Sequence, residues 1–189
     1  MFDFINQLSR ALSQPLPGPV AQYKMAHVAR RSTPTIPSNV REAGVLALFF
    51  PKNDKWQLAL IQRNNDNPND RHGGQISFPG GKREESDANL AETALRETEE
   101  EIGVQRSDIN LLGGLSELYI PVSNFRVEPY VGFLEYPPEF SPQPSEVQAV
   151  LEVPFNLLQN ESIRRETDLQ VTQQIMLKNV PYFGVDEHV

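Results

Sequence analysis

The chain has 189 residues, enough for one domain with a hydrophobic core. Apolar residues make up 39% of it and charged residues 22%, a composition typical of folded globular proteins. The absence of cysteine excludes disulfides, thiolate metal sites and cysteine nucleophiles. A net charge of −8 argues against nucleic acids and membrane surfaces as partners. No apolar run approaches the roughly 20 residues of a membrane-spanning helix. The first residues lack the basic start of a secretory signal, so we expect a cytoplasmic protein.

The first forty residues differ in pattern from the rest. Phe4, Ile5, Leu8 and Leu12 recur at helical spacing and predict a short amphipathic helix over residues 2–13. Five prolines follow between positions 15 and 37, so residues 14–41 should form a mostly irregular arm. We therefore divide the chain into a helix and proline-rich arm, 1–41, and a domain, 42–189.

The domain opens with strand patterns. The apolar run 44–50 predicts a strand covered on both faces, and the next strands are expected at 56–62 and 75–78. Residues 51–54 predict a hairpin turn, and Pro79-Gly80-Gly81 predicts a tight turn that lets a ligand approach the backbone.

A long helix is expected at 88–102, with Ser86 or Asp87 as its N-cap and Gly103 as its C-cap. Further strands are predicted at 109–117, 126–135, 147–153 and 170–177, with a helical turn at 154–159. Since strands and helices interleave, the fold class is α/β (α+β), with a mixed sheet and helices on both faces.

Negative charge is concentrated around this helix. Residues 84–101 hold eight acids and one base, Arg96, which leaves a charge of −7. Three acids share one face of this helix at spacings of three and four residues: Glu97, Glu100 and Glu101. Their carboxylates repel one another unless a cation lies between them, which favours a metal site. A hard divalent ion such as Mg²⁺ fits oxygen ligands, and the alternative is an ordinary solvated acidic face. Arg96 is spaced to bridge to Glu92 or Glu100.

The stretch from Gly81 to Val104 resembles the signature of the Nudix hydrolases: a glycine, an acid six residues on, then Arg-Glu-apolar-x-Glu-Glu-x-Gly-apolar. Arg96, Glu97, Glu100 and Glu101 match it, as do the glycine and apolar residue that follow. Thr98 replaces the usual aliphatic residue, Asp87 replaces the usual Glu, and one extra residue separates Gly81 from Arg96. We read Asp87 as an N-cap rather than as a ligand.

The resemblance extends upstream to the coenzyme A pyrophosphatase branch of that family. Its motif is an apolar strand ending in Arg63, a spacer, Arg71, and then Gly74-Gln75-Ile76-Ser77-Phe78-Pro79-Gly80-Gly81. In this branch the extra residue is usual. The similarity covers roughly residues 42–183. Members usually continue beyond a stretch like 180–183 into a further helix, whose loss would expose an apolar patch.

This resemblance implies the Nudix fold, an α/β/α sandwich, and hydrolysis of coenzyme A to 4′-phosphopantetheine and 3′,5′-ADP. It implies that Mg²⁺ or Mn²⁺ is held by Glu97, Glu100 and Glu101 and that a general base is needed, either Glu146 or a helix glutamate. The catalytic residues are then Arg96, Glu146 and the three metal ligands. Residues expected to bind the substrate, a nucleotide of the coenzyme A type, are Arg63, Arg71, Gly80, Gly81, Lys82 and Ser123.

Three alternatives stay open: a Nudix hydrolase with another substrate, such as ADP-ribose or a dinucleotide, a non-catalytic binding module, and a plain structural domain. The intact Glu97, Glu100 and Glu101 argue against the binding module, because simple binding demands no triplet of repelling charges. A homodimer is possible.

Overall fold

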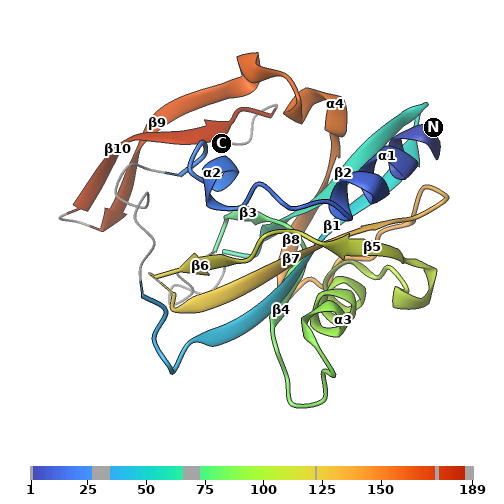
Figure 1. Cartoon of the computed structure of the whole chain (residues 1–189), viewed down its shortest axis with the longest axis horizontal. Helices are drawn as coiled ribbons and strands as arrows, with labels where there is room; N and C mark the ends of the chain where they lie inside the picture. The colour runs from blue at the N-terminus through green and yellow to red at the C-terminus, as the bar shows by residue number, and fades with distance from the viewer. Residues whose placement is uncertain (1, 27–34, 66–72, 122, 173–174, 186–189) are drawn as a thin grey trace.

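A computed structural model describes residues 2–26, 35–65, 73–121, 123–172 and 175–185. Strands and helices follow one another along the chain (Figure 1). The helices are α1 Phe2–Leu12, α2 Pro19–Gln22, α3 Leu90–Ile102 and α4 Phe155–Leu158, with 3₁₀ turns at Arg106–Asp108 and Glu161–Ile163. The strands are β1 Arg41–Lys52, β2 Lys55–Arg63, β3 Ile76–Ser77, β4 Gly80–Lys82, β5 Asn110–Gly114, β6 Leu118–Ile120, β7 Phe125–Phe133, β8 Val147–Pro154, β9 Arg164–Thr172 and β10 Ile175–Phe183.

The main sheet is mixed and is centred on β1. Its order is β3-β2-β1-β7-β5, while β4 pairs with β1, β6 with β7 and β8 with β2. β1 runs antiparallel to β2 through a tight turn at Asn53 and Asp54, both of which have positive φ, as a two-residue hairpin of this type requires. β1 runs parallel to β7 over nine residue pairs, which makes the sheet mixed as predicted.

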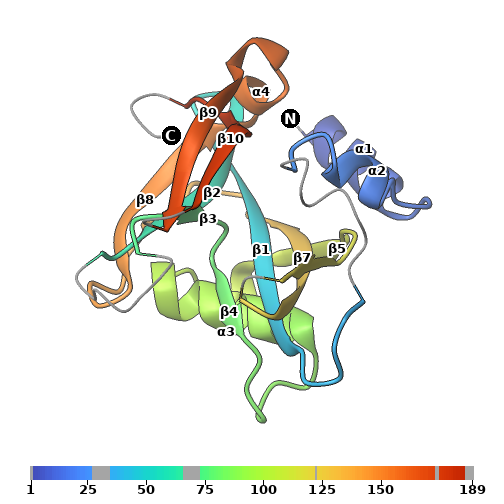
Figure 2. The ribbon, with the colours of Figure 1, turned by 90° about the vertical axis from the view of Figure 1, so that its left-hand side faces the viewer.

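Helices cover both faces of this sheet (Figure 2). Alternate residues of β1 point to opposite faces: Leu46, Leu48 and Phe50 join a cluster with Ala94 and Ile102 of α3. Ala47 and Phe49 join a second cluster with Ile5 of α1, and side chains of α4 pack against it. The expected strand covered on both faces is therefore confirmed, and with it the α/β/α fold class.

The N-terminal segment contributes to the second of these clusters, because Ile5 is buried and Leu8 and Leu12 pack beside it. The described part of the arm contains one short helix, α2, and the side chain of Gln22 donates hydrogen bonds to the backbone oxygens of Ser116 and Glu117. The division of the chain after residue 41 stays a prediction. None of the helices in the described ranges is long and apolar enough to cross a membrane.

Three predicted elements differ from the structure. The expected turn at Pro79-Gly80-Gly81 is instead a strand, β4, because residues 80–82 pair with residues 43–45 of β1. The region 109–135 holds three strands rather than two, since β6 separates β5 from β7.

The end of the chain also differs. The single strand expected at 170–177 is a hairpin of two strands, β9 and β10, which forms a separate two-stranded sheet. Its first strand begins with charged residues, Arg164-Arg165-Glu166, and so lacks the apolar alternation that identifies a half-buried strand.

Candidate functional site

The helix α3 carries most of the predicted site residues, and its two ends are fixed by caps. The side-chain oxygen of Asn89 accepts a hydrogen bond from the backbone N–H of Glu92 at 3.0 Å, so Asn89 is the N-cap. Gly103 ends the helix in the left-handed conformation, with φ of 73°. The predicted C-cap is confirmed, whereas the predicted N-cap at Ser86 or Asp87 is wrong because the helix starts later.

Asp87 is instead the buried partner of Arg96. Its carboxylate accepts hydrogen bonds from the Arg96 Nε at 2.9 Å and Nη2 at 3.0 Å, a bidentate pair. The hydroxyl of Thr93 and the backbone N–H of Glu84 each donate to it at 2.9 Å. The Arg96 guanidinium, followed by the Glu84 and Thr93 donors, holds the pKa of Asp87 well below its usual range against the effect of burial. This pair ties the loop before α3 to the middle of the helix.

Arg96 holds two of the three predicted metal ligands. Its Nη1 lies 3.0 Å from a carboxylate oxygen of Glu97 and 3.0 Å from one of Glu100. Its Nη2 also donates to the backbone oxygen of Lys82, at 3.3 Å, and so links α3 to the end of β4. Of the two bridges predicted for Arg96, to Glu92 or to Glu100, the structure has the one to Glu100. Glu100 is exposed, so its carboxylate faces solvent beside this guanidinium.

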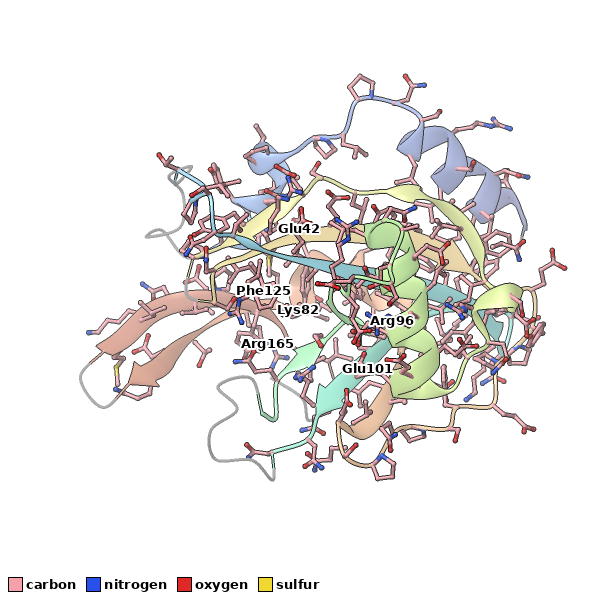
Figure 3. The ribbon with its side chains drawn as sticks, turned by 90° about the horizontal axis from the view of Figure 1, so that it is seen from below. Glu42, Lys82, Arg96, Glu101, Phe125 and Arg165 are labelled. Atoms are coloured by element: carbon pink, nitrogen blue, oxygen red, sulfur yellow. The ribbon has the colours of Figure 1, made fainter. Side chains whose placement is uncertain are left out.

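Glu101 lies on α3, where Figure 3 labels it. It is the most deeply buried acid of the three, with 1% of its side chain exposed. One carboxylate oxygen accepts a hydrogen bond from the backbone N–H of Gly80 at 2.8 Å, and the other lies 3.6 Å from Nη1 of Arg63. Burial raises the pKa of Glu101 to about 7, and the negative charge of Glu97 adds to the effect, while Gly80 and Arg63 oppose it. A buried carboxyl group that titrates near neutral pH is a feature of functional sites.

Glu97 lies over β4, one turn before Glu101. A Cβ atom on Gly81 would lie 2.4 Å from the carboxylate carbon of Glu97, so only glycine leaves room for this side chain. Gly80 also lies against β1: a Cβ there would meet the backbone oxygen of Gly44 at 2.4 Å. Of the two glycines predicted to admit a ligand, Gly81 therefore makes room for Glu97 and Gly80 for the backbone of β1. Burial raises the pKa of Glu97, and Arg96 partly offsets that rise.

Glu146, the candidate general base, borders the same carboxylates. It is an exposed residue just before β8, and its backbone oxygen accepts a hydrogen bond from the Asn64 N–H at 2.7 Å. Its negative charge contributes to the raised pKa values of both Glu97 and Glu101. Three acids from two separate segments, Glu97, Glu101 and Glu146, thus lie within electrostatic reach of one another.

Comparison with known proteins places this site in a family. The NUDIX domain model matches residues 40–174. The chain belongs to the Nudix family. It is 36% identical over 130 residues to "Nudix hydrolase 22, chloroplastic" of Arabidopsis thaliana, a match covering 68% of this chain and 42% of that protein. It is 31% identical over 154 residues to "Uncharacterized Nudix hydrolase NudL" of Yersinia pestis, covering 82% of this chain and 70% of that one.

A solved structure shares the Nudix fold. The NUDIX domain of Shewanella oneidensis NrtR, complexed with ADP ribose, aligns with a TM-score of 0.51 at 22% identity and covers 74% of this chain and 86% of that one. Our chain spans about half the length of several curated Nudix relatives that it matches, including the Arabidopsis protein.

Nudix hydrolases generally use divalent metal ions, and the donor set here suits one. Glu97, Glu100 and Glu101 offer only carboxylate oxygens, the ligands that Mg²⁺ and Mn²⁺ prefer. Their mutual repulsion, to which Glu146 adds, is the kind that a bound cation relieves. Across the described ranges, however, no three His, Asp or Glu side chains surround a single point. Arginine contacts occupy this Nudix site instead, through Arg96 and Arg63.

The remaining predicted residues are spread more widely. Lys82 is exposed at the end of β4, and Ser123 lies in the turn before β7, where its backbone oxygen accepts a hydrogen bond from Arg41. Ser123 comes two residues before Phe125, which pairs with Arg41 of β1, whereas Gly80 pairs with Val45, about 13 Å further along that strand. Arg71 lies outside the described residues.

Sequence reasoning missed the roles of Asp87 and Thr93 in holding Arg96. A signal for the role of Asp87 was present in the sequence, because this acid six residues after Gly81 occupies a position of the Nudix signature. Its position just ahead of the predicted helix suggested a cap, while its actual partner lies nine residues further on.

Proposed function

We propose that this chain catalyses the divalent-metal-dependent hydrolysis of a nucleoside diphosphate derivative, and that its substrate is coenzyme A or a coenzyme A derivative. The observation that carries the proposal is the gathering of Glu97, Glu101 and Glu146 beside Arg63, in a chain of the Nudix family. The raised pKa values of Glu97 and Glu101, at the edge of a glycine strand, serve no structural purpose of their own, because burying repelling carboxylates destabilises a fold.

The residues divide into three roles. Glu97, Glu100 and Glu101 would hold Mg²⁺ or Mn²⁺, and when bound such an ion neutralises phosphate charge and acidifies water. Arg96, held by Asp87, orients the carboxylates of Glu97 and Glu100. Glu146 is the general base: as an exposed carboxylate on a loop, it accepts a proton from the attacking water. The alternative base is one of the helix glutamates.

The products follow from the substrate. Water adds across the phosphoric anhydride, the P–O–P bond breaks, and coenzyme A yields 4′-phosphopantetheine and 3′,5′-ADP. Support for this substrate comes from the upstream motif, in which Arg63 and Arg71 flank a polar spacer before the Gly74-to-Gly81 stretch. Arginine suits the role, since its planar guanidinium binds phosphate through two hydrogen bonds. Lys82 and Ser123 are proposed to contact more distant parts of the substrate.

A second substrate deserves a test because the NUDIX domain of NrtR, which has the same fold, was solved with ADP ribose bound. ADP-ribose contains the same pyrophosphate link but has no 3′-phosphate. The ratio of the hydrolysis rates of coenzyme A and ADP-ribose therefore tests whether the groups around Arg63 recognise the 3′-phosphate. It does not test the carboxylates, which both substrates would need.

The test is hydrolysis by the full chain with Mg²⁺ or Mn²⁺, with coenzyme A, dephospho-coenzyme A and ADP-ribose as separate substrates and products identified by mass spectrometry. We expect 4′-phosphopantetheine and 3′,5′-ADP from coenzyme A, with the rate lost in Glu101→Gln. The exposed Glu85→Gln variant, which makes the same charge change in the loop before α3, is the control and should keep full activity. Cleavage of ADP-ribose alone would refute coenzyme A as the substrate. If none of the three compounds is cleaved, the proposed hydrolytic activity is refuted.

A further inference from the structure

A cavity lies between the segment around α2 and the start of β9, two parts of the chain that are far apart in sequence. Its volume is about 340 Å³, at the lower end of the range for small-molecule sites in proteins. The described residues that line it are Val20, Tyr23, Lys24 and Arg164. None of them belongs to α3 or to the segment of Glu146, so the cavity is separate from the acids of the candidate site.

Two cationic side chains line this cavity without a counter-charge. Lys24 is exposed just after α2, and Arg164 is exposed at the first position of β9. Within the part of the chain that the structure describes, neither side chain has a hydrogen bond or an ion pair. Four other arginines each pair with an acid: Arg83, Arg96, Arg106 and Arg126. In a chain with a net charge of −8, two unpaired cations on one cavity mark a place suited to an anion.

The other lining groups are apolar or aromatic. Val20 is 76% exposed, so it is an apolar side chain that the fold leaves uncovered. Tyr23, which is half-buried, adds an aromatic side chain to the lining. Phe183 of β10 lies directly opposite Arg164 in the hairpin register, on the same side of the hairpin, and is 39% exposed. A ligand that carries both a phosphate and a planar apolar group therefore matches this cavity.

We propose that this cavity is a second ligand site, which binds a nucleoside monophosphate: Lys24 and Arg164 hold the phosphate, and Tyr23 and Val20 contact the base. A phosphate accepts hydrogen bonds from both cations, and a guanidinium matches it with two parallel donors. A planar base packs favourably on an aromatic side chain. The inference goes beyond the proposed hydrolysis and uses no residue of the candidate site.

Isothermal titration calorimetry with the full chain tests this binding. The titrant is adenosine 5′-monophosphate (AMP), and divalent ions are first removed on a chelating resin, so that the acids of the candidate site repel the phosphate. Adenosine and inorganic phosphate are titrated separately. We expect AMP to bind more tightly than either of them and to bind more weakly as salt rises. Lys24→Gln and Arg164→Gln should each weaken AMP binding about fivefold, the size of an exposed charge contact.

Arg165→Gln is the matched control. Arg165 is also exposed, but its guanidinium lies against Gly184, where an added Cβ atom would meet it at 3.3–3.4 Å, and it is not part of the cavity lining. The variant makes the same change in net charge one position away, on the opposite side of the hairpin, and should alter the affinity for AMP by less than about twofold. Because Lys24 and Arg164 are exposed, replacing either should leave the thermal unfolding midpoint unchanged.

Each outcome bears on a stated part of the inference. If the wild-type chain does not bind AMP, the inference is overturned. Equal losses of affinity in Arg164→Gln and Arg165→Gln would overturn the placement of the phosphate, because net charge alone would then explain them. Inorganic phosphate that binds as tightly as AMP would overturn the contact with the base. Hydrolysis of coenzyme A is measured in a separate assay with metal, so this inference and the proposed function can fail independently.

Discussion

Replacing Asp87 by asparagine should destabilise the protein more than its position in a surface loop suggests. The Asp87 carboxylate accepts four hydrogen bonds and has 4% of its side chain exposed. Asparagine keeps the shape but turns an acceptor into a donor that faces the Arg96 guanidinium. Breaking a buried charge pair costs about 3–5 kcal/mol, and since Arg96 keeps Glu97 and Glu100 as partners we expect about 2–3 kcal/mol here.

The assay is equilibrium unfolding in urea, with thermal unfolding as a second measure. At about 2–4 °C per kcal/mol for a chain of this size, Asp87→Asn should lower Tm by about 5–10 °C. The exposed Glu85→Gln, in the same loop, should change stability by less than about 0.5 kcal/mol. A loss below about 1 kcal/mol in Asp87→Asn would refute the reasoning, because it would mean that Arg96 does not depend on Asp87.

The pH dependence of this variant has a definite sign. The folded-state pKa of Asp87 is depressed, first by Arg96, so its stabilising contribution is complete above the unfolded value of about 4. That contribution is lost as the pH falls from about 4 towards the lower folded value. The difference between wild type and Asp87→Asn should therefore be constant at neutral pH and shrink below about pH 4, and a difference that grows on acidification would contradict the assignment.

Two further variants test the geometry of the carboxylates. Glu101→Gln should stabilise the metal-free protein by about 3–4 kcal/mol at pH 8, because an ionised carboxylate whose pKa is raised from about 4.3 to about 7 destabilises the fold there. The gain should vanish below about pH 4, where the carboxyl group is protonated in both the folded and the unfolded state. Thermal unfolding in chelator checks this, and no gain at pH 8 would mean that Glu101 is adequately solvated. Gly81→Ala should lower kcat at least tenfold, because the new Cβ displaces the carboxylate of Glu97. The free energy of unfolding should fall by only about 1–2 kcal/mol, because a side-chain end moves rather than the backbone. Wild-type kcat in that variant would show that the position of Glu97 over β4 is not needed.

The sequence predicted the parts of the site that depend on local periodicity. The run over 44–50 and the helix with Glu97, Glu100 and Glu101 follow from the periods of strand and helix, and the structure has both. β4 has no such signal, because a three-residue strand with two glycines is formed by the approach of β1 and α3 rather than by its own preferences. The same holds for the Asp87–Arg96 pair, which joins a loop to a helix across a spacing that no helical period provides.

The placement of Arg63 was only half foreseen. The motif predicted it as a candidate phosphate ligand, whereas its contact with Glu101 depends on where the end of β2 lies relative to α3, which the sequence does not state. The differing burial of the three helix glutamates likewise came only from tertiary structure, since all three share one face on a helical wheel. Glu101 is covered by β4, while Glu100 remains in solvent.

The parallel pairing of β1 with β7 makes this a protein of non-local contacts. Each pair in that register joins residues 84 positions apart, as Arg41 does with Phe125. During synthesis at about 5–20 residues per second, β1 is therefore without β7 for roughly 4–17 seconds, in which β2 and then β4 are the strands that can pair with it. Throughout that interval the apolar edge that β7 will cover is open to other chains. Refolding should be slow for the same reason, and newly made protein should depend on chaperones until residue 133 has left the ribosome.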